Sequence, residues 1–324
     1  MQSSVYDQSI CLISNIAYSY YCMDMSQKTI AARFGISVPT VSRLLKRAKE
    51  EGIVSFSIKE ELRDCLKYEQ MLKDCFGVSN AFVVPTNLHP GLSEYEKMRM
   101  VALEGARYVQ RVIGPNDILG IGWGFTIYEL IHYLNPCRKE SSSFVTLHGS
   151  VSGIEQKLDV VSMAKRMAMA FGGTSFTIPY PGMPTSLDEA IRIRSLPEVK
   201  EVFSMFKHVT ISIAGIGSFY QNPVSRLTHA SNLTDDEINN LIASGVYGDI
   251  LLHFFDAHGS EVNNEVSSRI ITIDFNDYLN IPNKVIVASG DPKRNAMYAA
   301  LSGNLANTII IDHSLADYLV KANC

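Results

Sequence analysis

The chain of 324 residues lacks the patterns that mark membrane, secreted and metal-binding proteins. It has no run of about eighteen apolar residues, so we expect no membrane-spanning helix. Its N-terminus lacks a basic segment followed by an apolar one, which argues against a signal peptide. The six cysteines are scattered without a CxxC pair, so neither a zinc site nor a disulfide framework is expected. We therefore predict a cytoplasmic protein with reduced thiols.

Signatures of several enzyme classes are also missing. The absence of a Gly-Lys-Ser or Gly-Lys-Thr triplet argues against a nucleotide P-loop, and no GxSxG motif marks a hydrolase nucleophile. The eight histidines show no ligand spacing with one another or with cysteine. We therefore expect no metal, no cofactor and no catalytic residue of these types.

Acidic residues are absent from one stretch, residues 26–49. This stretch, SQKTIAARFGISVPTVSRLLKRAK, carries six basic residues, although the formal net charge of the chain is −4. Positive charge gathered in one place against the overall balance is typical of a surface that binds a polyanion such as DNA.

The same stretch has the pattern of two short helices. Ile30, Ala31 and Phe34 share one helical face, which Gly35 would end, and Ser37 is a natural N-cap for a second helix. Two short helices joined by a tight turn predict a helix-turn-helix, whose second helix enters the major groove of DNA. The alternative is a surface helical hairpin with solvated charges.

The side chains expected to contact DNA form two groups. The first turns of the second helix would lie nearest the base edges, whereas the remaining basic residues would meet phosphates. The base-edge candidates are Pro39, Thr40, Ser42 and Arg43, and the phosphate candidates are Lys28, Arg33, Lys46 and Arg47.

The flanking patterns suggest a division into domains. Residues 4–22, which include Val5, have mixed helical spacing and would complete a three-helix core, and residues 55–58 alternate as an edge strand does. An amphipathic helix is expected over 60–76, either a linker or a dimerisation helix. We therefore predict a helix-turn-helix domain (1–58), a linker or dimerisation helix (59–78) and a larger domain (79–324).

In the larger domain, strand-like runs alternate with helical patterns. Strands are predicted at 81–84, 117–121, 143–147, 174–178, 209–214, 250–255, 270–273, 284–288 and 308–311, and helices at 94–112, 126–134, 159–171, 234–243, 292–302 and 313–321. This alternation predicts a doubly wound, largely parallel α/β sheet covered on both faces. Ligands of such sheets bind at the carboxyl ends of strands, near a topological switch point.

A glycine-rich loop, GIGWGFT at residues 120–126, joins a predicted strand to a predicted helix. Its glycines permit close approach of a ligand, and the helix N-terminus favours a phosphate. The next strand ends in Leu147, His148 and Gly149 without the acid that a dinucleotide site requires, so a smaller phosphorylated ligand is favoured. The alternative is a plain tight turn.

Two further positions are candidates at strand ends. Gly290 follows a buried strand, with Asp291 as the expected N-cap and Lys293 in the first turn, where the helix dipole disfavours a cation unless it meets an anion. Asp249 precedes an apolar run and could accept hydrogen bonds from sugar hydroxyls, although a turn or capping role is the commoner one. A solvated surface residue is the alternative for Lys293.

The chain resembles the SorC family of bacterial sugar-responsive transcription regulators over nearly its whole length. The resemblance lies in SVPTVSRLLKRAKEEGIV, GIGWGFT, GVYGDILLHFFD and SGDPKRNAMYAALSGNLANTIIIDHSLADYLV. It implies a winged helix-turn-helix joined to a phosphosugar-binding effector domain (79–324) that is similar to sugar-phosphate isomerases and deaminases, in a protein that is usually a tetramer. The residues it implies for the effector are Gly122, Trp123, Gly124, Thr126, Gly149, Gly290 and Lys293, with Asp249 facing the sugar.

We therefore predict a DNA-binding transcription regulator, dimeric or tetrameric, whose operator affinity is set by a phosphorylated sugar or a related small metabolite. Such a regulator needs no catalytic residue. The rival hypothesis is a phosphosugar isomerase or deaminase that carries a DNA-binding appendage. That enzyme would need a general base over the sugar carbons, for which Asp249 and His253 are the candidates.

Overall fold

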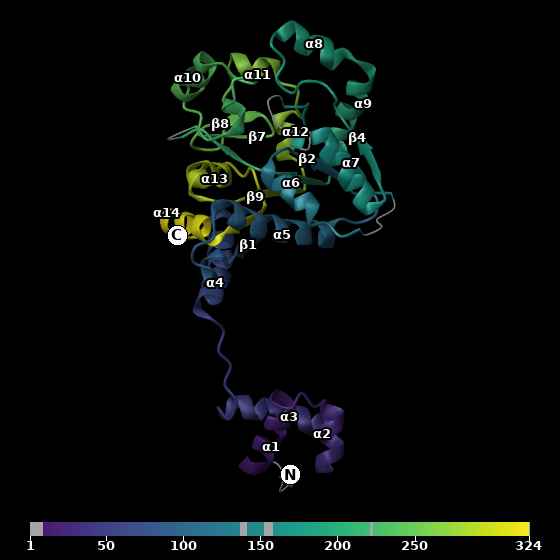
Figure 1. Ribbon diagram of the computed structural model, residues 1–324, viewed down its shortest axis with the longest axis vertical. Coiled ribbons are helices and arrows are strands. Elements are labelled where there is room, and N and C mark those ends of the chain that lie inside the picture. Colours follow the sequence, from purple (N-terminus) through teal and green to yellow (C-terminus); the bar gives the residue numbers. More distant parts are fainter. Residues whose placement is uncertain (1–8, 137–140, 152–157, 221–222, 324) are drawn as a thin grey trace. The chain divides into compact units, whose positions relative to one another are not determined.

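The computed structural model describes residues 9–136, 141–151, 158–220 and 223–323. The chain divides into two compact units, Met1–Lys59 and Glu60–Cys324. The helix of residues 60–76 belongs to the second unit, where it packs against the first strand and the last helix of that unit. Figure 1 shows the helices and strands of both units.

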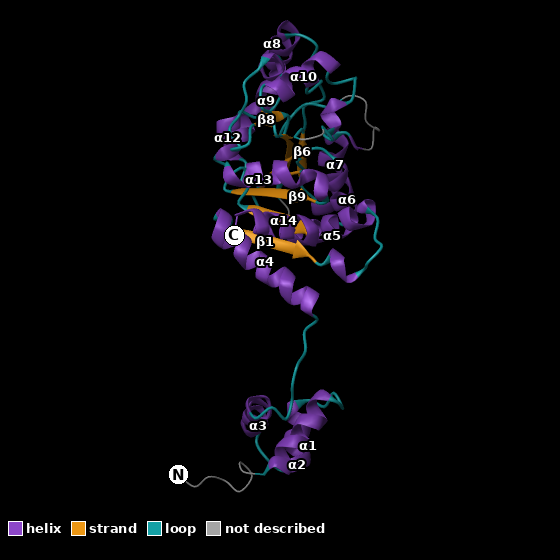
Figure 2. Ribbon diagram, turned by 90° about the vertical axis from the view of Figure 1, so that its left-hand side faces the viewer, coloured by secondary structure: helices purple, strands orange, loops and turns teal. Residues whose placement is uncertain are grey.

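The first unit is built from helices, which Figure 2 colours purple. They are α1 (Ile10–Tyr21), α2 (Gln27–Phe34) and α3 (Val38–Glu50). Their apolar stripes meet in one core, which contains Ile13, Ile16, Ala17, Ile30, Ala31, Val41, Leu44, Leu45 and Ala48. The predicted helix-turn-helix is therefore present, with a third helix completing the core.

The turn between α2 and α3 has the predicted caps. Gly35 ends α2 with φ of 65°, in the left-handed region that suits glycine, and its N–H donates to Ala31 O. The Ser37 hydroxyl accepts a hydrogen bond from the Thr40 N–H at 3.3 Å and so caps α3. These two caps fix where one helix ends and the next begins.

One prediction for this unit is wrong, and another concerns a residue outside the described ranges. Residues 55–58 form no strand, and Phe56 and Ile58 are exposed, because no neighbouring strand pairs with them or covers them. The predicted edge strand is therefore wrong, and the described part of the unit has no β-wing. The first helix begins at Ile10, and Val5 lies outside the described residues.

The second unit contains a seven-stranded parallel sheet in the order β1-β10-β9-β5-β2-β3-β4. The strands are β1 (Asn80–Val84), β2 (Ile118–Ile121), β3 (Ser143–Thr146), β4 (Thr174–Phe176), β5 (Ile211–Ala214), β9 (Asn283–Ala288) and β10 (Thr308–Asp312). After β2 the chain moves outward to β3 and β4, whereas after β5 it moves the opposite way to β9 and β10. The topological switch point therefore lies between β2 and β5.

Helices cover both faces of this sheet, because alternate strand residues point to opposite sides. Ile309 and Ile311 lie in a core with α4 (Glu60–Phe76), α13 (Arg294–Ser302) and α14 (His313–Asn323). Ile310 lies in the opposite core, with α5 (Glu94–Val112), α6 (Phe125–His132) and α7 (Val160–Phe171). The prediction of a doubly wound α/β fold is confirmed.

A small antiparallel sheet, β6-β7-β8, replaces one predicted strand. The run 250–255 is divided between β7 (Gly248–Ile250) and β8 (His253–Phe255), which pair with each other and with β6 (Gly217–Ser218). The expected single strand is wrong because Leu251 and Leu252 adopt φ of 51° and 71° and turn the chain back. The run 270–273 is likewise no strand, and Thr272 makes only an isolated bridge to His148.

The other predicted strands and helices of this unit are present, with ends that differ by no more than two residues. Several helices were not predicted: α8 (Leu187–Ser195), α9 (Pro197–Met205), α11 (Glu265–Arg269) and α12 (Phe275–Leu279). The predicted helix over 234–243 is α10 (Asp235–Ala243). The additional helices lie around the small sheet and the adjoining face of the large one.

The described cysteines are not all free thiols. Cys11, Cys22 and Cys65 carry free thiols, whereas Cys75 is disulfide-bonded, so the expectation of reduced thiols is wrong at Cys75. Cys137 and Cys324 lie outside the described residues. No helix in the described ranges is long and apolar enough to cross a membrane.

The Ser37 cap leads to a first prediction. Ser37→Ala should destabilise α3 by about 1 kcal/mol, because the Thr40 N–H loses its acceptor. Amide hydrogen exchange in α3 should then become roughly five-fold faster, while exchange in the parallel sheet stays unchanged. Ser57→Ala is the control, since Ser57 is exposed and lies outside the helices. Unchanged exchange in α3 would contradict the role of the cap.

Candidate functional site

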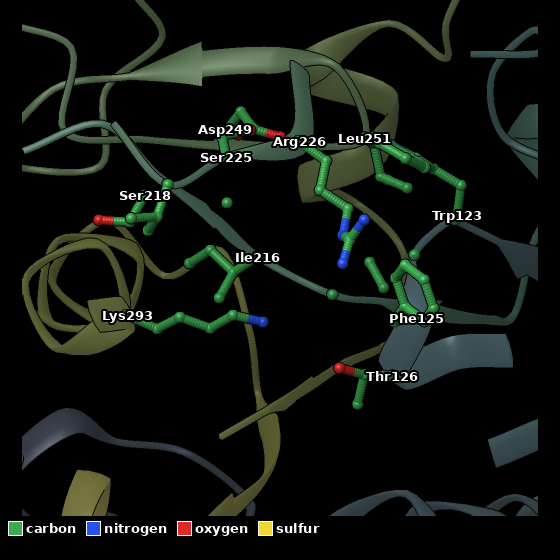
Figure 3. Close-up of a pocket in the computed structure, with 16 residues that line it drawn as sticks. Trp123, Phe125, Thr126, Ile216, Ser218, Ser225, Arg226, Asp249, Leu251 and Lys293 are labelled. Atoms are coloured by element: carbon green, nitrogen blue, oxygen red, sulfur yellow. The ribbon is translucent and has the colours of Figure 1, made fainter. Parts of the chain in front are cut away.

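A hollow at the switch point brings together loops that are distant in sequence. It has about 690 Å³ of empty space, part of it open to solvent, and it lies where β2 and β5 end. Figure 3 shows its side chains. We call it the switch-point cavity; its lining residues are Gly122, Trp123, Gly124, Phe125, Thr126, Ala214, Gly215, Ile216, Gly217, Ser218, Val224, Ser225, Arg226, Asp249, Leu251 and Lys293.

The glycine loop after β2 supplies one wall of the cavity. Gly124 precedes α6 with φ of 129°, a conformation that side chains rarely adopt, and no side chain caps this helix. The first N–H groups of α6 therefore have no side-chain acceptor, and the buried Thr126 adds a hydroxyl beside them. Uncapped N–H groups with a nearby hydroxyl form a suitable site for an anion.

A buried histidine supports this loop from behind. The Trp123 N–H donates to His148 Nε2 at 3.1 Å, and His148 Nδ1 lies 2.7 Å from Gly149 O. Nε2 must therefore be the unprotonated nitrogen, and Nδ1–H donates to the carbonyl. Burial lowers the pKa of His148 to about 4, so the ring is neutral. No sequence pattern marks His148 as part of the site, because its partner is a backbone N–H, which leaves no spacing signal.

Lys293 enters the cavity from the opposite side. It ends a 3₁₀ turn, η6 (Asp291–Lys293), that follows β9, and its side chain points into the hollow (Figure 3). Burial lowers the pKa of Lys293, although the charge of Asp249 raises it. The described residues offer its ammonium no hydrogen bond or ion pair, so it is placed to meet an anion.

The expected cap of this segment is wrong. Gly290 rather than Asp291 stands at the N-cap position of η6, and no side chain caps the turn. The Gly290 N–H instead donates to Asp312 Oδ2 at 2.7 Å, at the end of β10. The strand-end carboxylate of Asp312 therefore holds the loop that carries Lys293.

Asp249 forms the inner polar end of the cavity. It lies on β7, is 6% exposed, and accepts a hydrogen bond from Ser225 Oγ at 2.5 Å. A Cβ on Gly217 would lie 1.9 Å from Asp249 Oδ1, so only glycine leaves room for this carboxylate. Burial raises the pKa of Asp249 to about 6, while Ser225 and Lys293 oppose the shift.

The predicted effector residues separate into two sets. Gly122, Trp123, Gly124, Thr126, Asp249 and Lys293 line the switch-point cavity, and Gly290 lines an adjoining hollow that shares Thr126 and Lys293 with it. Gly149 lines neither. Its backbone packs against Gly182, and a Cβ there would lie 2.5 Å from Tyr180 O, so packing explains the glycine.

Leu251 and Arg226 are among the lining residues that were not foreseen. Leu251 reaches the cavity because the tight β7–β8 turn was taken for a continuous strand. Arg226 lies over the Phe125 ring, with Cζ 3.8 Å from the ring centroid. A lone arginine in a loop carries no sequence signal of its own.

The structure also separates the two candidate bases of the rival enzyme. His253 Nδ1 lies 2.6 Å from Glu261 Oε1, and Nε2 lies 2.8 Å from Ile273 O. His253 borders a different hollow, together with Arg194 and Asp274. Asp249 is therefore the candidate base that lies in the switch-point cavity.

The predicted DNA-contacting residues lie on α2 and α3. Lys28, Arg33, Pro39, Ser42, Arg43 and Lys46 are exposed, and Thr40 and Arg47 are half-buried. Thr40 Oγ1 lies 2.8 Å from Ser37 Oγ, so its hydroxyl takes part in the cap. Near the end of α3, Lys46 pairs with Glu50 at 3.6 Å and Arg47 with Glu51 at 2.5 Å. Binding to phosphate would therefore replace weak intrahelical pairs.

The raised pKa of Asp249 predicts how stability depends on pH. Because the folded chain protonates Asp249 near pH 6 and the unfolded chain near 3.8, stability is gained as the pH falls through this interval. Wild type should therefore gain about 2 kcal/mol relative to Asp249→Asn between pH 7.5 and 4.5. Urea unfolding followed by Trp123 fluorescence measures this difference.

The neutral His148 has the opposite effect, because the unfolded chain protonates it first as the pH falls. His148 is present in both proteins, so its contribution cancels in the difference. A difference between wild type and Asp249→Asn that does not change with pH would show that the carboxyl is not held in a low-dielectric site.

Known protein families match the sequences of both units. A family described as "Putative sugar-binding domain" matches residues 60–321, and one described as "Homeodomain-like domain" matches residues 15–56. The chain is 30% identical to the sorbitol operon regulator of Klebsiella pneumoniae over 96% of its length and 98% of that protein. It is 28% identical to the deoxyribonucleoside regulator of Bacillus subtilis, over 93% and 95%.

The fold of the whole chain has a close counterpart among solved structures. The crystal structure of the full-length sorbitol operon regulator SorC from Klebsiella pneumoniae has a TM-score of 0.75 and 28% identity, and the match covers 96% of this chain and 99% of that one. The sugar-binding family covers well over half of the chain, and the similarity to SorC runs through both units. The chain therefore belongs to the SorC family of transcription regulators, as its sequence motifs predicted.

Proposed function

We propose that this protein is a transcription regulator whose affinity for operator DNA is controlled by a phosphorylated sugar bound in the switch-point cavity. The observation that carries the proposal is the pairing, in one cavity, of a buried lysine and an uncapped helix N-terminus with a buried carboxylate. The lysine and the helix N-terminus suit a phosphate, and the carboxylate suits the hydroxyl groups of a sugar. The same chain carries the helix-turn-helix that would read the operator.

The phosphate would bind between α6 and η6. The N–H groups at the start of α6, the Thr126 hydroxyl and the Lys293 ammonium come from segments that follow β2 and β9. Parallel strands place their carboxyl ends at the same edge of a sheet, so these segments converge although about 170 residues separate them in sequence. Each of these groups is a donor, and the lysine also brings charge.

The sugar would extend toward Asp249. The carboxylate has one oxygen in a hydrogen bond from Ser225, and a sugar hydroxyl can donate to its remaining lone pairs. The names of two relatives refer to sorbitol and to deoxyribonucleosides, which are hydroxylated compounds. A related phosphorylated compound fits a cavity with one cationic and one acceptor end.

Binding without turnover is the second part of the proposal. A general base at Asp249 would also need a group that donates a proton or a hydrogen bond to the carbonyl oxygen of the sugar. Lys293, which lines the same cavity, would be occupied by the phosphate, and His253 borders a different hollow. A regulator requires only that the effector bind its two states differently.

The mode of DNA binding bears on the oligomeric state of the protein and on its place in the cell. Helix-turn-helix proteins read two half-sites with a symmetric pair of recognition helices, so we propose a homo-oligomer, dimeric or tetrameric, that acts in the cytoplasm. The resemblance to SorC regulators supports the same assembly. The α4 helix, with Leu66 exposed, is the segment that we propose for part of the subunit contact.

Lys293 gives the sharpest test of the effector site. Lys293→Ala should weaken binding of a phosphorylated sugar by about 1.5–3 kcal/mol, or roughly ten- to a hundred-fold, because a charge-assisted contact is lost. Calorimetry with ribose 5-phosphate, glucose 6-phosphate, fructose 6-phosphate and sorbitol 6-phosphate measures it. The control is Lys200→Ala, an exposed lysine on α9 outside the cavity.

Folding and operator binding without effector should survive in Lys293→Ala, because the DNA-contacting residues belong to the other unit. Equal affinity of Lys293→Ala and wild type for the sugar phosphate would exclude Lys293 from the phosphate site. Sustained conversion of a sugar phosphate by the wild type would favour the rival enzyme.

The DNA interface is tested by two substitutions in α3. Arg47→Ala should weaken binding about equally for all sequences and reduce the slope against salt by about one, because one phosphate contact is lost. Arg43→Ala should relax the preference at one operator base, at a cost of about 1–3 kcal/mol there. Electrophoretic mobility shifts at several salt concentrations measure both, with Arg192→Ala, at an exposed position on α8, as the control. Unchanged affinity in both variants would remove α3 from the groove.

A further inference from the structure

The carboxylate of Asp312 joins the loop that carries Lys293 to the helix α14. Asp312 ends β10, is fully buried, and stands directly before α14 in the chain. Its Oδ2 accepts the Gly290 N–H at 2.7 Å, whereas its Oδ1 accepts the Leu315 N–H at 2.8 Å and the Ser314 hydroxyl at 3.0 Å. Because a carboxylate is rigid and planar, a displacement of one oxygen also displaces the other.

The same carboxylate acts on Lys293 electrostatically. Burial lowers the pKa of Lys293, whereas the negative charges of Asp249 and Asp312 raise it and so favour the ammonium form. A bound phosphate would give this ammonium the direct contact that the described residues do not offer, and the loop from Gly290 to Lys293 would adjust to it. Asp312 would follow the loop, since it holds the Gly290 N–H.

Further along the helix, α14 is bonded to α4 through a tyrosine. The Tyr68 hydroxyl donates to Asp317 Oδ1 at 2.7 Å, and the centroid of the Tyr68 ring lies 5.4 Å from that of His313. The hydrogen bond to Asp317 raises the pKa of Tyr68 to about 12, so the phenol keeps the proton that it donates. Leu72 of α4 and Leu319 of α14 lie in the same core.

The position of α4 in the chain makes this bond relevant to DNA binding. Figures 1 and 2 both show α14 beside α4, which begins at Glu60, directly after the last residue of the first unit, Lys59. A shift of α4 therefore acts on the chain that leads to the helix-turn-helix. The bonds at Asp312 and Tyr68 form a continuous connection from the Lys293 loop to this helix.

We propose that α14 carries the effect of the bound sugar phosphate from the Lys293 loop to α4, with the Tyr68–Asp317 hydrogen bond as the link between the two helices. This inference rests on the proposed function, because it assigns a route of regulation to the same site. The bond favours movement of α4 together with α14, since it is lost when one helix shifts without the other. It therefore contributes to the coupling free energy between effector and operator.

The experiment measures how strongly the effector changes operator binding by the full-length protein. The probe is the sugar phosphate that gives the largest thermal shift among the four named above, and the operator is a duplex that the wild type selects from random sequences. Fluorescence anisotropy gives the operator affinity without the probe and at saturation, and the ratio of the two is the coupling factor. The affinity for the probe, with and without operator, must yield the same factor, because coupling is reciprocal.

Three substitutions at the link are compared with one control. Tyr68→Phe removes a single hydroxyl and should reduce the coupling factor by roughly three- to ten-fold, the contribution of one hydrogen bond. Asp317→Ala should have the same effect, and the double variant should go no further than either alone, because both remove the same bond. Asp317→Asn keeps an acceptor and should retain most of the coupling. The control, Tyr180→Phe, removes a tyrosine–carboxylate bond to Glu198 at 2.5 Å and should behave as wild type.

The outcomes that overturn the inference differ from a failure of the proposed function. If Tyr68→Phe and Asp317→Ala keep the coupling factor of wild type while Lys293→Ala loses affinity for the probe, the signal does not pass through this link, and the proposed function stands. If Tyr180→Phe reduces the factor as much as Tyr68→Phe does, the loss is a general effect of destabilisation. If wild type binds none of the four sugar phosphates, or its operator affinity does not respond to them, the proposed function and this inference both fail.

Discussion

The divergence of the chain between two adjacent parallel strands is the constraint on which the candidate site depends. The connections that follow β2 and β5 leave in opposite directions, so a crevice forms outside the carboxyl ends of these two paired strands. Backbone N–H groups, a lysine and a carboxylate can enter this crevice from loops that are far apart in sequence. The parallel sheet, buried on both faces by two separate cores, makes the position of each loop rigid.

The electrostatics of the cavity follow from what surrounds each group. Asp249 and Lys293 lie in the same hollow, yet burial disfavours the charged form of each, which raises the pKa of the carboxyl and lowers that of the ammonium. Their opposite charges compensate only in part, and Arg226 adds another positive charge. A ligand that brings negative charge to one end and hydroxyl groups to the other satisfies all of these groups together, and this complementarity is the physical basis of the proposed specificity.

Local signals predicted most of the fold and part of the site. Gly35 and Ser37 act within a few residues, so the helix-turn-helix could be read from the sequence. Buried parallel strands have continuous apolar sequences, and this pattern predicted the strands of the large sheet. The same pattern led to the wrong prediction of one strand over residues 250–255, where an apolar sequence contains a turn. Residues 55–58 alternate like a strand and are not one, because alternation without a partner strand forms no ladder.

The missed site residues share one property, since their roles are created by contacts distant in sequence. His148 supports the loop at Trp123 through a backbone N–H, and Arg226 is oriented by a ring about 100 residues earlier in the chain. One glycine, in contrast, was predicted as a site residue and is not one. Gly149 ends a strand as a ligand-binding glycine would, but it is required by close packing against Gly182. Tertiary packing alone distinguishes these cases.

The tight turn of the small sheet explains why the acceptor end of the cavity is fixed. Leu251 and Leu252 both have positive φ, which costs of order 1–3 kcal/mol for each residue that is not glycine. The conformation persists because Leu252 is fully buried, and because Thr272 Oγ1 donates to Leu251 O at 2.7 Å. Asp249 is paired with Phe254 across this same hairpin. A strained but over-determined turn therefore holds the carboxylate in place without help from a ligand, so the proposed effector would meet a preformed acceptor and would spend little binding energy on ordering it.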